Sequence, residues 1–324
     1  MSKAKNTNLN KAGINKEDEF YTKITDIEKE LRYYKHYFKN KTIFCNCDDP
    51  EYSNFWRYFQ LNFYELGLKK LISTHYEEKE PSYKMEIVAT DTDTQIGIPD
   101  YVKTPLKGNG DFRSPECIEI LKEADIVITN PPFSLYTEYV KQLMEYQKKF
   151  IIIGRETVAT NKYIFPLIKE GEIWTGYNNG DMEFVVPSYY EPRETRYREE
   201  NGIKYRSLGN ALWLTNLDIP KRHEDLQVFR QYREEDYEKF DFYDAIFVKK
   251  LTDIPCDYAG VMGVPITILH HHNPEQFEIV GLLAGNIRGL AGIPSKVDKD
   301  GPYINGKMKF GRILIRNKRL QDEN

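Results

Sequence analysis

A short apolar run at residues 124–129 (ADIVIT) leads directly into two consecutive prolines, and this junction constrains the fold more than any other feature of the chain. The run is typical of a buried β-strand. Asn130, Pro131, Pro132 and Phe133 follow it. Because proline fixes φ and lacks a backbone donor, the strand must end there. We therefore expect a stiff turn from strand to helix whose backbone carbonyls are held in place.

Strand-like and helix-like segments alternate along most of the chain. Strands are expected at 42–45, 70–74, 85–90, 125–129, 150–153, 172–175 and 211–215, and helices at 17–38, 54–66, 115–122, 134–146 and 160–168. This alternation predicts an α/β fold with a doubly wound, mostly parallel sheet. Such sheets bind ligands at the carboxyl ends of their strands, where the strand order reverses. Asp48, Asp111 and Asn130 can all reach that edge, so we expect the functional site there.

Beyond residue 176 the alternation weakens, and shorter strand-like runs are expected at 245–248, 265–269, 277–283 and 312–315. We expect a flexible basic arm at 1–16, a donor-binding and catalytic domain at 17–176, and a region at 177–324 that holds the remaining sheet strands and recognises the target. A formal net charge of −4 disfavours a passive nucleic-acid coat, which is usually basic. This net charge does not exclude an enzyme that binds DNA through one basic face.

Cysteine usage and hydropathy indicate the compartment. The four cysteines are not spaced as zinc ligands or as a redox pair, so we expect buried thiols in a reducing cytoplasm and no metal. The His270-His271-His272 tract has no accompanying ligand spacing and is expected to be a turn. We find no export signal and no long apolar segment, so neither export nor a membrane partner is expected.

The Asn-Pro-Pro-Phe turn suits the methylation of an amino group that is conjugated to a ring. The lone pair of such an amine is delocalised, so the nitrogen must become more tetrahedral before it attacks a methyl sulfonium. Two acceptors that pull on its N–H bonds favour that state. The Asn130 side-chain oxygen and the Pro131 carbonyl are suited to this role, and Phe133 offers a flat face for a base. A base in a duplex must first flip out. The alternative interpretation is a purely structural turn.

Three short segments combine acidic and aromatic residues that suit a methyl donor. Carboxylates can bind its ammonium group or ribose hydroxyls, and aromatic faces attract both a sulfonium and an adenine. An acidic loop, a helix start and a simple turn are the ordinary structural alternatives. The candidate donor-binding residues are Phe20, Tyr21, Asn46, Asp48, Asp49, Pro50, Asp111 and Phe112.

Together these segments resemble the EcoRI adenine-specific methyltransferase family. The resemblance covers nearly the whole chain from about residue 17, and it rests on DEFYT (18–22), CNCDDP (45–50), GLKKLI (67–72), NPPF (130–133), LGNALWLTN (208–216) and IPCDYAGVMGVP (254–265). One departure from methyltransferases in general is that CNCDDP stands where a glycine-rich loop usually follows the first strand.

The resemblance implies a Rossmann-like, class I S-adenosylmethionine-dependent methyltransferase. It implies transfer to the N6 of a flipped adenine in double-stranded DNA, as the modification half of a type II restriction–modification system. It further implies a monomer and a GAATTC-like site. NPPF would be catalytic, with the donor pocket built by DEFYT, CNCDDP and the Asp111 loop.

Basic residues in a Tyr-, Arg- and Glu-rich stretch are candidates for contacts with DNA phosphates or guanine edges. A solvated charged surface is the equal alternative, because glutamates are interleaved with them. The candidates are Arg193, Arg196, Arg198, Lys204 and Arg206.

Other functions remain open on the residues alone. An RNA or protein-glutamine N-methyltransferase uses the same amine chemistry, and so does a cytosine-N4 methyltransferase, although the latter more often has Ser at the Asn130 position. A non-catalytic DNA-binding protein on the same fold is the alternative from another class. The intact turn at 130–133 argues against it.

Overall fold

The computed structural model describes residues 20–47, 49–77, 82–90, 97–285, 289–297 and 301–320. The chain forms two compact units, of which the first comprises Met1–Glu156 with Asn178–Leu217 and the second Thr157–Tyr177 with Asp218–Asn324. The expected basic arm at 1–16 lies outside the described residues. The expected division at residue 176 concerns functional regions and stays a prediction.

A ten-stranded sheet dominates the first unit, in the order β1-β8-β10-β7-β6-β2-β3-β4-β5 with β9 paired to β10. Its strands are β1 (Tyr21–Thr22), β2 (Thr42–Cys45), β3 (Lys70–Thr74), β4 (Tyr83–Val88), β5 (Val102–Pro105), β6 (Ile126–Thr129), β7 (Lys149–Arg155), β8 (Trp174–Val186), β9 (Tyr197–Glu200) and β10 (Ile203–Thr215). β2 pairs in parallel with β3 and β6, and β6 with β7. β4, β5 and β10 join antiparallel. The α/β class is therefore confirmed, with the parallel part confined to the centre of a mixed sheet.

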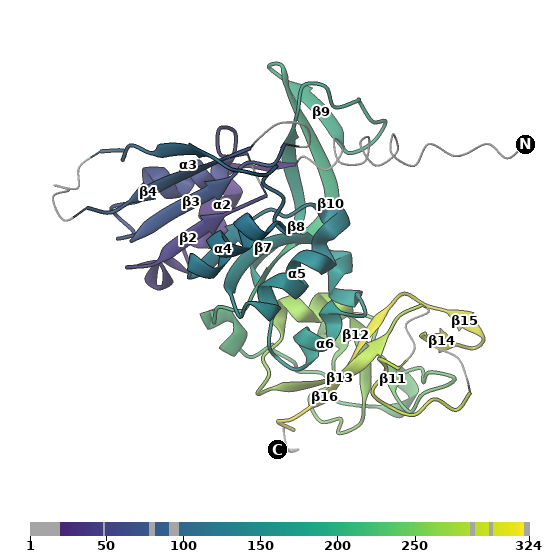
Figure 1. Cartoon of the computed structure of the whole chain (residues 1–324). Helices are drawn as coiled ribbons and strands as arrows, with labels where there is room; N and C mark the ends of the chain where they lie inside the picture. The colour runs from purple at the N-terminus through teal and green to yellow at the C-terminus, as the bar shows by residue number, and fades with distance from the viewer. Residues whose placement is uncertain are drawn as a thin grey trace, which may run out of the picture. The chain divides into compact units, whose positions relative to one another are not determined.

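Helices cover both faces of this sheet. They are α2 (Ile24–Leu31), α3 (Asn54–Leu61), α4 (Pro115–Glu123) and α5 (Tyr136–Glu145). The crossovers β2-α3-β3 and β6-α5-β7 run in opposite directions along the sheet, so right-handed connections place α3 and α5 on opposite faces. Figure 1 shows α4 and α5 in front of the strands and α2 and α3 behind them. Ser53 and Ser114 cap the amino termini of α3 and α4, each accepting backbone N–H bonds.

The longest strands, β8 and β10, extend well beyond the runs expected at 172–175 and 211–215. β9 and β10 form a hairpin that pairs Glu200 with Ile203. Asn201 and Gly202 make its turn, with φ of 51° and 76°. Positive φ at both positions is the geometry that two-residue hairpins prefer. In Figure 1 this hairpin projects beyond the rest of the sheet.

The second unit has its own sheet, in the order β11-β12-β16-β13, and a separate β14-β15 hairpin. The strands are β11 (Ile246–Phe247), β12 (Met262–Pro265), β13 (Phe277–Leu283), β14 (Tyr303–Ile304), β15 (Lys307–Met308) and β16 (Arg312–Asn317), and the helix is α6 (Ile164–Lys169). The strand expected at 265–269 is wrong. After Pro265 the chain forms a 3₁₀ helix, Ile266–His271, because β12 ends its pairing with β16 at that proline.

Short 3₁₀ helices make up the remaining regular structure. They are η1 (Lys35–Tyr37), η2 (Phe133–Leu135), η3 (Glu156–Thr160), η4 (Pro220–His223), η5 (Glu234–Asp236), η6 (Leu251–Asp253) and η7 (Ile266–His271). In the part of the chain that the structure describes, no helix is long and apolar enough to cross a membrane.

Candidate active site

Two loops leave the sheet side by side at the point where the strand order reverses. β2 continues through α3 to β3 on one side, and β6 continues through α5 to β7 on the other. The carboxyl ends of β2 and β6 are paired, with Phe44 opposite Val127. The Thr129 hydroxyl donates to the Asn46 carbonyl and ties the two loops together. This is the edge at which such sheets bind ligands, and the sequence predicted both loops there.

Asn130 is buried, and only the nitrogen of its side-chain amide has a hydrogen-bond partner among the described residues. Its side chain is 6% exposed, and Nδ2 donates to the Phe20 carbonyl at 2.5 Å. That bond fixes the amide orientation, because two carbonyl oxygens at this separation would repel each other. Oδ1 has no hydrogen-bond partner among the described residues. A buried unpaired acceptor costs about 1–3 kcal/mol, so it calls for an explanation. A donor on a bound substrate provides one.

The two prolines hold the turn in a single shape. Pro131 is buried, and Pro132 has φ −60° and ψ 126°. The Pro132 carbonyl accepts the Leu135 N–H at 3.0 Å and starts η2. The Pro131 carbonyl lies before that turn, one residue from Asn130.

An aromatic cluster surrounds Phe133, which is itself partly buried. Its ring centroid lies 5.8 Å from that of Phe20 and 6.2 Å from that of Phe184. Phe20 also contacts Tyr190, at 6.2 Å. The Arg155 guanidinium lies over the Phe133 ring, 5.2 Å from its centroid.

Phe184, Tyr190 and Arg155 were not predicted from the sequence. Arg155 ends β7, the parallel strand next to β6, so the rule that places ligands at carboxyl ends of strands gives a signal for it. Phe184 and Tyr190 lie in a region without local periodicity and carry no such signal.

On the β2 side, Asp49 lies among hydrogen-bond donors. Its Oδ1 accepts the Tyr83 hydroxyl at 2.7 Å, and His75 Nε2 lies 3.6 Å from its Oδ2. Pro50 is buried, and Asp48 lies outside the described residues. The Asn46 side chain is 2% exposed and accepts the Tyr139 hydroxyl from α5. Asn46 thus holds this loop to α5 through its hydrogen bond with Tyr139.

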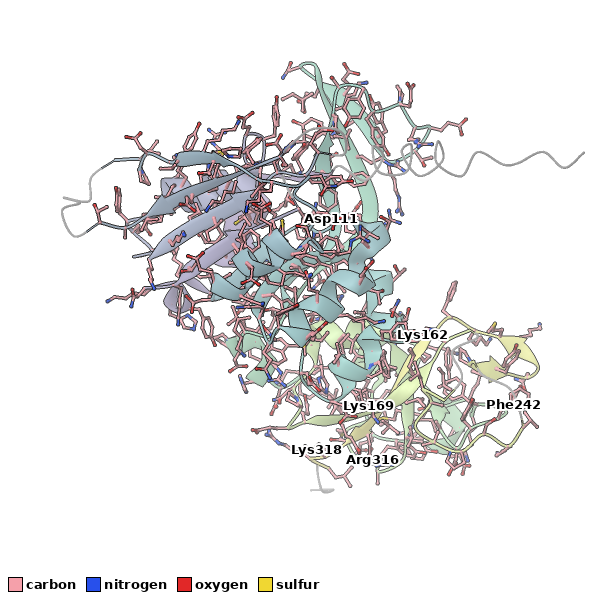
Figure 2. All side chains as sticks on the ribbon, in the orientation of Figure 1. Asp111, Lys162, Lys169, Phe242, Arg316 and Lys318 are labelled. Carbon is pink, nitrogen blue, oxygen red and sulfur yellow. The ribbon has the colours of Figure 1, made fainter. Side chains whose placement is uncertain are left out.

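The Asp111 loop lies against the end of β3. A Cβ at Gly110, where φ is +78°, would come within 1.8 Å of the His75 carbonyl oxygen, so only glycine permits this approach. Asp111 precedes α4 (Figure 2) and forms an ion pair with Arg113, whose Nη2 lies 2.6 Å from Oδ2. Hydrogen bonds from Arg113 lower the pKa of the Asp111 carboxyl. The Phe112 ring is buried 5.1 Å from that of Tyr139.

Tyr21 places an aromatic ring near the connection from β2 to α3. β1 pairs with β8, and the Tyr21 ring lies 6.3 Å from the ring of Tyr52, which is 69% exposed. Among the described residues, no group of three or more His, Cys, Asp or Glu side chains could hold a metal ion.

The five basic candidates lie on the β9–β10 hairpin and the loop before it. The Arg198 guanidinium pairs with Glu183 at 2.7 Å and also with Glu200. Lys204 Nζ donates to the Ser188 and Tyr190 carbonyls, at 2.5 and 2.8 Å. Arg206 donates to the Thr195 and Arg196 carbonyls. Arg193 lies 5.9 Å from the centre of the Tyr190 ring, and Arg196 is exposed.

An α/β sheet with an Asn-Pro-Pro-Phe turn at its switch point defines the class of enzymes that methylate amino groups. The family model described as adenine-specific methyltransferase EcoRI matches residues 8–318. The chain therefore belongs to the EcoRI adenine-specific methyltransferase family and is a DNA adenine methyltransferase of the restriction–modification type, as the sequence predicted.

Curated relatives agree over nearly their full lengths. Type II methyltransferase M.EcoRI of Escherichia coli is 47% identical over 332 residues, covering 98% of each chain. M.MgeORF184P of Mycoplasma genitalium is 38% identical, covering 96% of this chain and 99% of its own. M.MpnI of Mycoplasma pneumoniae is 36% identical, covering 96% and 98%. No solved structure matches the chain significantly.

Proposed function

We propose that the enzyme transfers the methyl group of S-adenosylmethionine to the N6 of an adenine that has flipped out of duplex DNA. The observation that carries this proposal is Asn130, whose Oδ1 is buried and unpaired while its Nδ2 is anchored to the Phe20 carbonyl. An exocyclic amine with two N–H donors is complementary to Oδ1 and the adjacent Pro131 carbonyl.

The chain's own residues prepare the amine for attack. Asn130 Oδ1 and the Pro131 carbonyl each accept one N–H bond, which draws the nitrogen toward a tetrahedral shape and frees its lone pair. Because the amide is already fixed by Phe20, the acceptors need no reorganisation when the reaction occurs. Phe133 stacks against the base. The acceptors hold the amine in line with the donor methyl group, so that the N–C bond would form as the donor's C–S bond breaks and a neutral thioether leaves. The excess proton on the nitrogen would then pass to solvent.

Residues at the adjoining edge fit the methyl donor. The site offers a partly exposed carboxylate in Asp49, a second carboxylate in Asp111, and aromatic rings in Phe20, Tyr21 and Phe112. These are the groups that bind ribose hydroxyls, an ammonium and an adenine ring. When bound, S-adenosylmethionine supplies an electrophilic methyl group on a sulfonium. Asn46, Asp48 and Pro50 complete the proposed loop, with Asn46 shaping it through Tyr139.

The β9–β10 hairpin is proposed to face the DNA. Arg193 and Arg196 contact phosphates in this proposal, with Arg198, Lys204 and Arg206 on the same surface. The proposal includes a monomer that acts in the cytoplasm without a metal ion, and a GAATTC-like recognition site.

Methyl transfer from labelled S-adenosylmethionine to unmethylated genomic DNA tests this function. Asn130→Ala removes the free acceptor, and loss of one preorganised polar group at a reacting centre lowers kcat by about 10²–10³. Asn62→Ala is a matched control, because Asn62 Nδ2 also donates to a backbone carbonyl, that of Tyr58, but at the far end of α3. We expect label in adenine with wild type and the control and almost none with Asn130→Ala. Sequencing the modified positions then identifies the site.

Other outcomes would redirect the assignment. Label in RNA or in a protein glutamine, with none in DNA, would contradict the proposal. So would an Asn130→Ala variant as active as Asn62→Ala.

A further inference from the structure

We propose that Arg155 binds a backbone phosphate beside the flipped adenine and so holds the target nucleotide against Phe133. This inference rests on the proposed function, because it takes DNA as the substrate and Phe133 as the surface that receives the base.

Its position in the sheet brings Arg155 to the catalytic turn. β7 runs parallel to β6, and Ile152 is paired with Thr129, the residue that precedes Asn130. Arg155 ends β7 three residues further on, so it emerges at the same carboxyl edge. Its guanidinium carbon lies 5.2 Å from the centroid of the Phe133 ring. Arg155 is therefore a direct neighbour of the ring that receives the base.

The charge of Arg155 has no protein counter-ion in the described part of the chain, in contrast to the charges of Arg113 and Arg198 in the same unit. Arg155 is exposed, and no carboxylate of the described residues lies within 4.0 Å of it. Arg113 pairs with Asp111 and Glu138, and Arg198 pairs with Glu183 and Glu200. A guanidinium at the mouth of a site for a polyanion, without a protein counter-ion, is suited to an anionic group of the substrate.

The chemistry of a stacked guanidinium matches a phosphodiester. A guanidinium that lies over an aromatic ring keeps its N–H donors in its own plane, directed away from the ring. Stacking and bidentate binding of phosphate oxygens therefore do not compete. A flipped nucleotide brings its own phosphates to the mouth of the base pocket, since the base stays attached to the backbone. Arg155, whose guanidinium carbon lies over the Phe133 ring, can thus bind a phosphate while it stays against that ring.

Salt-dependent binding to a duplex that carries the sequenced site tests the inference. Each phosphate contact adds about 0.9 to the slope of log affinity against log salt concentration. We expect Arg155→Gln to reduce that slope by about 1 and to weaken binding about tenfold near 0.15 M salt. Arg155→Lys should restore the slope and recover part of the affinity. Arg32→Gln is the matched control, because Arg32 also lies over an aromatic ring, that of Tyr33 at 4.7 Å, but directly after α2.

A second readout separates nucleotide holding from general stability. With 2-aminopurine in place of the target adenine, the fluorescence increase on flipping should fall in Arg155→Gln and stay at the wild-type level in Arg32→Gln. An unchanged salt slope in Arg155→Gln, with methyl transfer by wild type intact, would overturn the role of Arg155 alone. Absence of methyl transfer to DNA by wild type would overturn the proposed function and this inference together.

Discussion

We expect two buried tyrosines one turn apart on α5 to respond differently to the loss of their hydroxyl groups. Tyr139 is 0% exposed and donates to Asn46 Oδ1 in the loop after β2. Tyr136 is 2% exposed, and in the described part of the chain its hydroxyl has no hydrogen-bond partner. Tyr139→Phe keeps the ring against Phe112 and removes the hydroxyl, which contacts Cys47 as well as Asn46.

The size of each effect follows from what is left behind. Tyr139→Phe leaves Asn46 Oδ1 without this donor in a site that is 2% exposed, and an unsatisfied buried acceptor costs about 1–3 kcal/mol. We expect the free energy of unfolding to fall by about 2 kcal/mol, or Tm by about 4–8 °C for a unit of this size. Tyr136→Phe removes a buried hydroxyl that gains nothing, so we expect no loss of stability.

Urea unfolding and thermal melts of the two variants beside wild type measure this difference. Donor affinity, measured by calorimetry, should weaken in Tyr139→Phe, because Asn46 begins the loop after β2 that is proposed to hold the donor, and should remain unchanged in Tyr136→Phe. The reasoning fails if Tyr139→Phe is no less stable than Tyr136→Phe.

Three further changes test other parts of the site. Gly110→Ala should destabilise the first unit by about 2 kcal/mol or more, because it adds a clash with the His75 carbonyl to the strain of a positive φ. Gly97→Ala is the control, because Gly97 has φ +115° but nothing within 4 Å of its Cβ. Equal melting temperatures for the two variants would refute the clash. The Arg113 hydrogen bonds lower the pKa of Asp111, so their stabilisation is present above about pH 3.9 and is lost as pH falls through the folded-state pKa. Melts of wild type and Asp111→Asn should therefore differ at pH 7 and converge below about pH 4, whereas a constant gap would count against the ion pair. Lys204→Met should speed proteolysis of the loop at 187–196, because the Ser188 and Tyr190 carbonyls lose the donor that Lys204 provides. If only the salt dependence of DNA binding changes, Lys204 contacts DNA instead.

Local signals were enough for the centre of the sheet. The strands at 42–45 and 70–74 have the expected bounds, because each is a short run that is buried on both faces. The strand at 277–283, in the sheet of the second unit, also has the expected bounds. The sequence also located the turn at 130–133, since Pro131 and Pro132 must end β6. The edge-binding rule for parallel strands then placed the β2 and β6 loops together without any contact information.

The hairpin at the end of the sheet shows what was missed and why. Its Asn201-Gly202 turn is a strong local hairpin signal, and it was present in the sequence. The flanking residues are charged rather than alternately apolar, because β9 is mostly exposed. The hydropathy pattern therefore did not predict β9, which is held by backbone pairing to β10 and by the Arg198 ion pairs.

Phe20 explains why the segment at 18–22 and the turn at 130–133 were harder to connect from sequence than to find. The two segments are 110 residues apart, and the link between them is a backbone carbonyl that accepts from Asn130 Nδ2. Because any residue at position 20 supplies that carbonyl, no pattern of side chains in the sequence indicates its contact with Asn130. The Phe20 ring adds a second link, through its contacts with Phe133 and Tyr190. A shift of Phe20 would therefore move the partner of the Asn130 amide and a ring that contacts Phe133 together.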